Sequence, residues 1–247
     1  MTTKLPKYRR PLNTHQLAIL NTLYKFRLTT ASLLADNQQA KHTRVISNRL
    51  KILVDQGYVG MNYDSSYKIQ GKPATYYLAT DGVKYLRQQP YTQESALRSI
   101  YQDKRANDSQ IQHRLNVFKT YITLKQKYPY RFKFHSKTEL MNKPYIPKTR
   151  PDAYLVDTKS DKSYFLDYLE DNMSFWTLRK AIKRYIGFAE LEIWQKHKPE
   201  QPHPKVLFVC ESEKLKRKVA TMVNRELDSS FVHLDTKVQA FGSLIFS

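Results

Sequence analysis

The sequence predicts an α+β fold, in which an N-terminal winged helix-turn-helix domain is followed by a C-terminal α/β domain. Within residues 13–87, apolar residues at helical spacing give way to a pattern typical of a β-hairpin. From about residue 129 onward, strand-like and helix-like segments alternate. The predicted domains are a winged helix-turn-helix at residues 1–90, a helical connector at 91–128 and an α/β domain at 129–247.

The first two helices are predicted from apolar spacing and from a capping residue. From Leu17 onward, apolar residues recur every three or four positions, so one stripe of the first helix faces inward. Thr30 suits the N-cap of a short second helix, because its hydroxyl can accept from a free backbone N–H. We expect the inward residues to be Leu17, Leu20, Leu23, Tyr24, Leu33 and Leu34, and the water-facing ones to be Thr14, Gln16, Asn21 and Lys25.

The third helix is predicted at residues 41–56, with Gly57 as its C-terminal stop. Most charged helix faces are simply solvated. This one follows a short helix and precedes a hairpin, which is the order in which a recognition helix is presented to the major groove. The predicted buried residues are Val45, Ile46, Leu50 and Leu53, and the candidate DNA-binding residues are Lys41, Thr43, Arg44, Ser47, Asn48 and Lys51.

A hairpin rich in aromatic and β-branched residues is predicted next. Its strands are residues 58–63 and 74–79, and the intervening residues 64–73 have the composition of a turn. Lys68 and Lys72 lie near the tip, where we expect them to contact phosphates. Thr80 is then expected to cap a further helix that carries Val83, Tyr85 and Leu86 and closes the domain.

The charge of the chain independently favours a polyanionic partner. The sequence has 42 Lys+Arg against 22 Asp+Glu, a formal net charge of +20, and residues 1–90 carry 14 Lys+Arg against 4 Asp+Glu, half of that excess. Such a charge raises affinity for nucleic acid and makes the affinity fall with salt. General solubility and an anionic membrane surface are the alternatives. We expect no membrane attachment, because the sequence shows no apolar run of about 18 residues, no signal peptide and no lipidation motif.

Cysteine usage favours a reducing compartment. Cys210 is the single cysteine, so the chain can form neither an intrachain disulfide nor a cysteine-built zinc site. It ends an apolar segment, and we expect it to be a core residue. The expected localisation is cytoplasmic.

The connector is predicted to be helical from about residue 95 to 127, after a break around Pro90. A polar patch at residues 104–109 can split it into two helices. Its first part either serves as a spacer or dimerisation element or packs on the winged domain. His113 is expected to be a hydrogen-bonded packing residue rather than a ligand or catalyst.

The C-terminal domain is predicted to run helix, three strands, helix, strand, helix, strand. Ser174 is the expected cap of its long helix. The predicted strands are residues 131–135, 153–156, 164–169, 205–210 and 231–234, and the predicted helices are 174–196 and 213–227.

That order is also the core order of the restriction-endonuclease-like fold, whose motif is Pro-Asp followed by (Asp/Glu)-x-Lys. Pro151 and Asp152 open one predicted strand, and Asp167 lies fifteen residues later on the next. Carboxylates on adjacent strands can hold Mg²⁺, which polarises a phosphodiester and activates a water. Leu169 occupies the lysine position. The domain is therefore either a metal-dependent nuclease or a nuclease-like fold kept for binding or assembly, and its candidate residues are Asp152, Asp167, Glu139, Glu170, Lys180 and Lys183.

Short motifs between residues 13 and 188 resemble the replication-relaxation family of plasmid and mobile-element proteins. They include residues 28–34, residues 49–59, His113-Arg-Leu-Asn, Pro151-Asp-Ala and Lys183-Arg-Tyr. The resemblance implies a DNA-binding protein that acts in replication initiation, DNA relaxation or conjugative mobilisation. The family's Glu-x-Asp or Glu-x-Glu pair is replaced here by a different spacing of Asp167, Glu170 and Asp171.

The first hypothesis is a non-enzymatic duplex DNA binder that positions a relaxase or replication initiator and forms a homodimer. Arg44, Ser47, Asn48 and Lys51 would read the groove. A metal-dependent nuclease or nickase using Asp152 and Asp167 is the alternative, and Mg²⁺ is expected as a cofactor only in that case. The seven histidines do not form the cluster that a tyrosine relaxase needs for its metal. A transcriptional repressor with a ligand-sensing C-terminal domain is a third possibility.

Overall fold

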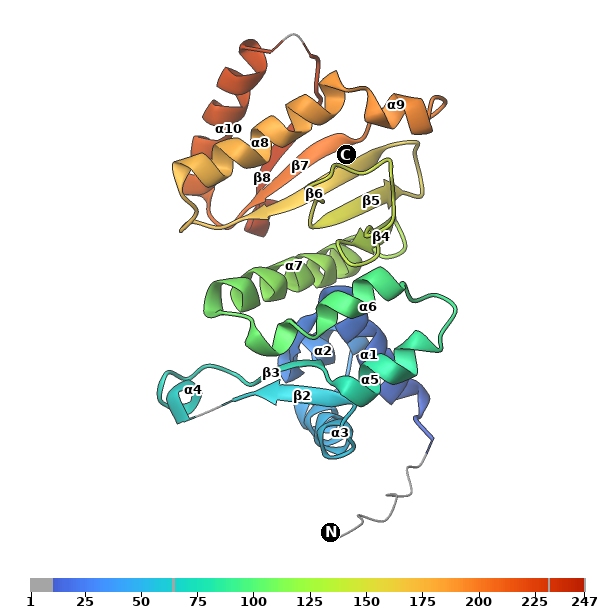
Figure 1. Ribbon diagram of the computed structural model, residues 1–247. Helices are drawn as coiled ribbons and strands as arrows, with labels where there is room; N and C mark the ends of the chain where they lie inside the picture. The colour runs from blue at the N-terminus through green and yellow to red at the C-terminus, as the bar shows by residue number, and fades with distance from the viewer. Residues whose placement is uncertain (1–10, 64, 231, 247) are drawn as a thin grey trace. The chain divides into compact units, whose positions relative to one another are not determined.

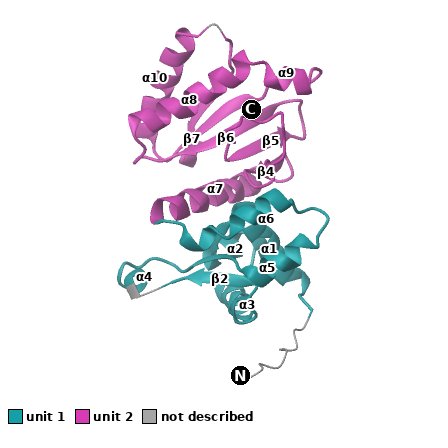
Figure 2. Cartoon of the chain, in the orientation of Figure 1, with its two compact units in different colours: residues 1–107 teal, residues 108–247 magenta. Residues whose placement is uncertain are grey.

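The computed structural model describes residues 11–63, 65–230 and 232–246 and shows a mixed α+β protein with two sheets. The chain forms two compact units, residues 1–107 and residues 108–247 (Figure 2). The segment expected to be a connector is divided between them. Helix α6 (Glu94–Ile100) belongs to the first unit and α7 (Asp108–Lys127) to the second.

The first unit packs helices around a small antiparallel sheet of order β1-β3-β2. Both the helices and the strands contribute buried residues to its core. In chain order its elements are α1 (Thr14–Phe26), β1 (Leu28–Thr30), α2 (Ala31–Gln38), α3 (Thr43–Asp55), β2 (Val59–Asn62), α4 (Ser65–Ile69), β3 (Thr75–Leu78), α5 (Thr80–Arg87), α6 and the 3-10 turn η1 (Asp103–Arg105).

Helix α1 begins with a capping box that the apolar spacing does not show. The Asn13 side chain accepts from the Gln16 backbone N–H at 2.9 Å, and Gln16 Oε1 accepts from the Asn13 backbone N–H at 3.0 Å. The prediction that Gln16 faces water is therefore wrong, because this reciprocal bond buries its side chain. Leu17 is only partly buried, and Ile19 takes a core position instead.

The helices α2 and α3 are present where the sequence predicts them, although Leu33 of α2, expected to face inward, is only partly buried. The Thr30 hydroxyl caps α2 by accepting from the Leu33 backbone N–H, and Gly57 follows α3 with a φ of 76°. Ile46, Leu50 and Leu53 are buried, but Val45 is 41% exposed, so its predicted burial is wrong. The buried stripe of α3 follows i, i+4, i+7 spacing and is too narrow to include the residue beside Ile46.

The hairpin is present, with β2 and β3 paired antiparallel, but its connection contains the short helix α4 instead of a simple turn. Asp64, at the start of that connection, lies outside the described residues. The sequence prediction missed β1, which pairs antiparallel with β3. Thr80 is the first residue of α5, not its cap, because Ala79 holds the N-cap position and makes no side-chain bond.

The second unit is a five-stranded sheet of order β4-β5-β6-β7-β8 with helices on both faces (Figure 1). Pairing is antiparallel from β4 to β6 and parallel from β6 to β8. After α7, its elements are β4 (Phe132–Ser136), β5 (Ala153–Asp157), β6 (Ser163–Leu169), α8 (Phe175–Glu190), α9 (Ile193–His197), β7 (Lys205–Cys210), α10 (Glu213–Asp228), β8 (Thr236–Ala240) and the 3-10 turn η2 (Phe241–Ser243).

Alternation along the strands assigns each face of this sheet to its helices. Tyr154, Phe165 and Val206 are register partners and pack in the core that α8 and α10 cover. On the opposite face, Phe134 meets Tyr121 of α7 with ring centroids 5.0 Å apart. Cys210 is buried, as expected for a core residue.

Two predictions for the second unit need correction. The helix capped by Ser174 ends at Glu190, because Glu192 adopts a left-handed conformation (φ 51°) and starts the separate helix α9. The last strand is β8, not residues 231–234. Phe231 lies outside the described residues, and residues 232–235 form a loop whose Leu234 is buried against the core. The apolar pattern there therefore reflects loop packing. Among the described helices, none is both long and apolar enough to cross a bilayer.

Candidate functional site

Six of the eight predicted DNA-binding residues of the first unit share one exposed surface. Lys41, Thr43, Arg44, Ser47, Asn48 and Lys51 are all exposed on or just before α3, and we call them the α3 surface. Arg44 and Asn48 are one turn apart, as are Ser47 and Lys51. The Ser47 hydroxyl donates to the Thr43 carbonyl at 3.2 Å, which is a local bond along the helix. The opposite side of α3 holds it in the core through Ile46, Leu50 and Leu53.

The connection between β2 and β3 presents two further cations. Lys68 and Lys72 are both exposed, and the chain between them reverses at Gly71, which has a φ of 63°. The Lys72 backbone N–H donates to the Tyr67 carbonyl at 2.9 Å, and its ammonium lies 5.9 Å from the Tyr67 ring centroid. The tip, residues 68–72, is therefore a basic turn closed by a backbone hydrogen bond.

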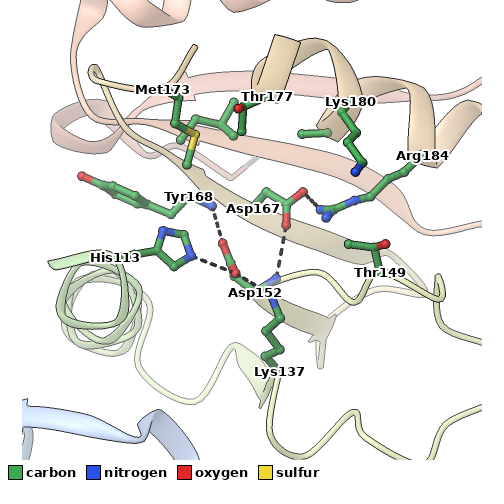
Figure 3. Close-up of a pocket in the computed structure, with 12 residues that line it drawn as sticks. His113, Lys137, Thr149, Asp152, Asp167, Tyr168, Met173, Thr177, Lys180 and Arg184 are labelled. Carbon is green, nitrogen blue, oxygen red and sulfur yellow. Dashed lines mark hydrogen bonds and ion pairs between the residues drawn. The ribbon is translucent and has the colours of Figure 1, made fainter. Parts of the chain in front are cut away.

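The second unit contains a cavity of about 240 Å³ in which Asp152 is the central carboxylate (Figure 3). Asp152 precedes β5 and is 6% exposed. Its Oδ2 accepts from the Tyr168 backbone N–H at 3.0 Å, and its Oδ1 lies 3.1 Å from His113 Nε2 and 3.6 Å from Lys137 Nζ. Burial opposes ionisation of Asp152, but the charges of His113 and Lys137 and the bond from Tyr168 hold its pKa below the usual range.

Asp167, on the adjacent strand β6, is bound differently. Its Oδ1 accepts from the Asp152 backbone N–H at 3.2 Å. Its Oδ2 accepts from the Tyr185 hydroxyl at 2.9 Å and forms an ion pair with Arg184 of α8. Burial raises the pKa of Tyr185, so this hydroxyl remains a donor. The two carboxylates are thus adjacent, and each is held by basic or hydroxyl side chains.

His113 of α7 lies between two carboxylates. In addition to its contact with Asp152, its Nδ1 is 3.5 Å from Glu170 Oε1, and Asn116 donates to the same oxygen at 3.4 Å. Burial opposes the charged form, but Asp152 and Glu170 raise the pKa of His113 to about 10. His113 is therefore a cation at neutral pH. It is hydrogen-bonded, as the sequence predicts, and it also joins Asp152 to Glu170.

The remaining candidate site residues lie in different surroundings. Lys180 lines the cavity, whereas Lys183 lies 3.6 Å from Glu226. The Glu139 carboxylate accepts from the backbone N–H and the hydroxyl of Ser136. Leu169, at the position of the motif lysine, is 3% exposed and packs in the core beneath α8.

The oxygen donors of Asp152 and Asp167 are of the type that Mg²⁺ prefers, but their arrangement does not fit a metal site. Lys137, His113 and Arg184 already neutralise these carboxylates. Across the part of the chain that the structure describes, no three His, Cys, Asp or Glu side chains are grouped to hold a metal ion.

Several residues of the cavity were not predicted from the sequence. Lys137 comes from the loop after β4, and Arg184 and Tyr185 come from α8, so only the fold brings them to the carboxylates. The motifs His113-Arg-Leu-Asn and Lys183-Arg-Tyr contain four members of this network. Those two motifs were the sequence signal from which these four residues could have been predicted.

The model of one protein family, described as replication-relaxation, matches residues 20–202 of the chain. The matched region includes the α3 surface, the basic turn and the cavity. No curated protein and no solved structure matches the chain.

Proposed function

The chain belongs to the replication-relaxation family, and from this we propose that it binds duplex DNA of a plasmid or other mobile element through its α3 surface. The family suggests a role in the replication or relaxation of such an element. We assign this chain the role of a non-enzymatic accessory factor in replication, relaxation or conjugative mobilisation.

The α3 surface is the observation that carries this proposal. We propose that the first unit is a winged helix-turn-helix, in which α2 and α3 are the paired helices and the β2–β3 connection is the wing. An α-helix fits the major groove, where Arg and Asn side chains can each make paired hydrogen bonds to a base edge. Arg44 and Asn48 are exposed one turn apart on α3, which suits contacts to neighbouring base pairs.

The basic turn supports the same orientation on DNA. Lys68 and Lys72 suit phosphate contacts beside the groove, which position a protein without reading sequence. The net charge of +20 adds long-range attraction to the polyanion.

For the second unit we propose a nuclease-like fold kept for binding or assembly. The observation behind this is that Asp152 and Asp167 are each paired with cations, which leaves no open carboxylate pair for a catalytic metal. Its proposed partner is a relaxase or replication initiator. We also propose a homodimer, because winged domains commonly pair on inverted repeats.

The test is a comparison of sequence discrimination by the parent and by an Arg44→Ala, Asn48→Ala variant of the full chain. Duplexes that the parent enriches from a random-sequence pool are compared with an unselected duplex of equal length in a binding titration. We expect the variant to lose most of the discrimination, because each paired base contact contributes about 1–3 kcal/mol. Its circular dichroism should match the parent, since both side chains are exposed.

A Gln88→Ala, Arg98→Ala variant is the matched control, since it removes the same kinds of group from exposed positions of the same unit. It should discriminate like the parent. Equal discrimination by the α3 variant and the control would refute the proposal. The non-enzymatic role is tested by incubating the parent with supercoiled plasmid and Mg²⁺ or Mn²⁺. Nicking of the plasmid that depends on Asp152 would overturn that role.

A further inference from the structure

A pair of exposed aromatic residues opens helix α8. Phe175 is 45% exposed and Trp176 is 70% exposed, although large aromatic side chains usually become buried when a chain folds. Their rings meet edge to face, with centroids 5.6 Å apart. The contact gives the indole a defined orientation and leaves most of it in solvent.

Basic side chains continue from Trp176 along the exposed face of α8. Arg179, Lys180 and Lys183 follow it at three, four and seven residues, which places them on the same side of the helix. The buried side is separate and consists of Leu178, Ile182, Tyr185, Ile186 and Phe188. The Arg179 guanidinium lies 5.9 Å from the Trp176 ring centroid, so cation and aromatic ring form one continuous surface.

The helix layer that carries this surface is strongly basic. Together α8 and α10, which cover the same face of the sheet in Figure 1, contain nine Lys or Arg against four Asp or Glu. Arg179 and Lys183 share one carboxylate, Glu226, so a positive excess remains on α8 itself. Lys180 reaches into the cavity beside Arg184, as Figure 3 shows.

We propose that Trp176, Phe175 and Lys180 form a stacking site for single-stranded DNA on the second unit. An exposed indole offers a flat surface to any unpaired base, and interleaved cations hold the backbone phosphates, which is how single strands are bound without sequence preference. Duplex DNA fits poorly, because its bases are already stacked on one another. The assignment to DNA rests on the proposed function, since replication and relaxation both expose unpaired strands.

Tryptophan fluorescence provides a direct readout of this site. Trp176 and Trp194 are the two tryptophans of the chain. Trp194 is 1% exposed, packs against Tyr145 and Phe165, and donates its indole N–H to the Gln201 carbonyl at 3.1 Å. Quenching on addition of a nucleic acid therefore reports contact at Trp176.

The experiment titrates the full chain with an oligothymidylate of about 16 nucleotides, the upper range of a single-strand site. We expect quenching of the parent. In Trp176→Ala the quenching should be absent, and affinity for the labelled oligonucleotide should fall about tenfold, the loss of roughly one stacked base. Trp176→Tyr should stay within about threefold of the parent, because its ring still stacks.

Tyr130→Asn is the matched control. Tyr130 is a 96% exposed aromatic of the same unit, and Asn tolerates its positive φ of 61°. Unchanged oligothymidylate affinity in Trp176→Ala would overturn the proposal. So would tighter binding of an oligouridylate, or an emission change caused by anionic vesicles and not by the oligonucleotide.

The two DNA proposals can fail separately. The Arg44→Ala, Asn48→Ala variant should keep the oligothymidylate quenching while losing duplex discrimination. The Trp176→Ala variant should lose the quenching and keep the duplex discrimination. If duplex discrimination depends on the α3 surface but no quenching occurs, the stacking site alone is rejected.

Discussion

Among single residues, His113 has a charge state that is coupled to the folding of the second unit. Its pKa is raised from an ordinary 6.5 to about 10, so folding stabilises the protonated form. This contribution to stability is fully present below pH 6.5 and is lost as the pH rises through the folded-state pKa. A stability decline between these two pH values should therefore follow from His113.

His113→Gln should remove that part of the pH dependence and destabilise the second unit. The free energy of unfolding should fall by about 2–3 kcal/mol. This is at or below the lower end of the loss expected for breaking a buried ion pair, because the His113 side chain is 27% exposed and water screens its charge. Urea unfolding measured from pH 6 to about pH 10 checks this. Parallel pH profiles for parent and variant would show that His113 does not carry the effect.

The candidate site shows what the sequence can and cannot predict about single residues. Asp152 and Asp167 were identified because strand patterns place Pro-Asp and the next acidic residue on neighbouring strands. Their partners Lys137 and Arg184 were not, because ion pairs between distant elements leave no periodic trace. Of the two lysines proposed to reach the carboxylates, Lys180 lines the cavity, whereas Lys183 pairs with Glu226 of α10.

Among the elements, α5 and α8 each contain one glycine, and the two differ in their surroundings. A Cβ at Gly82 of α5 would lie 2.2 Å from the Tyr58 carbonyl oxygen, whereas a Cβ at Gly187 of α8 would meet no atom within 4 Å. Glycine inside a helix costs about 1 kcal/mol relative to alanine. Close packing against a backbone atom thus explains one glycine and leaves the other unexplained.

Gly187→Ala should therefore stabilise the protein by about 1 kcal/mol, and Gly82→Ala should destabilise it despite the same gain in helix propensity. The clash at Gly82 involves backbone, so relief requires α5 to move away from Tyr58, the residue before β2. Chemical denaturation of the two variants, read against the parent, measures both effects. A stabilised Gly82→Ala variant would contradict the close contact.

The elements also show where prediction from sequence succeeds. Helices with continuous apolar stripes, such as α3 and α10, were predicted at nearly their observed bounds, because periodicity and caps are local signals. The strand β1 was missed, since three residues are too few to show alternation and its stability comes from pairing with β3. The strand β8 was misplaced because the buried loop residue Leu234 resembles part of a strand.

For the whole molecule, the net charge of +20 makes salt a decisive variable in any DNA measurement. Each phosphate that a cation neutralises releases condensed counterions, so the logarithm of affinity falls with the logarithm of salt concentration by about 0.9 for each contact on duplex DNA. The slope counts phosphate contacts and is insensitive to base contacts.

The salt dependence of binding therefore distinguishes phosphate contacts made by the basic turn from base contacts made by the α3 surface. Lys68→Ala with Lys72→Ala should reduce the slope for an unselected duplex by about 2, and affinity should fall equally for selected and unselected duplexes. Lys133→Ala with Lys162→Ala removes the same charge from exposed positions of the second unit and should leave the slope near that of the parent. If both pairs lower the slope equally, attraction comes from total charge, and the basic turn has no special place in the complex.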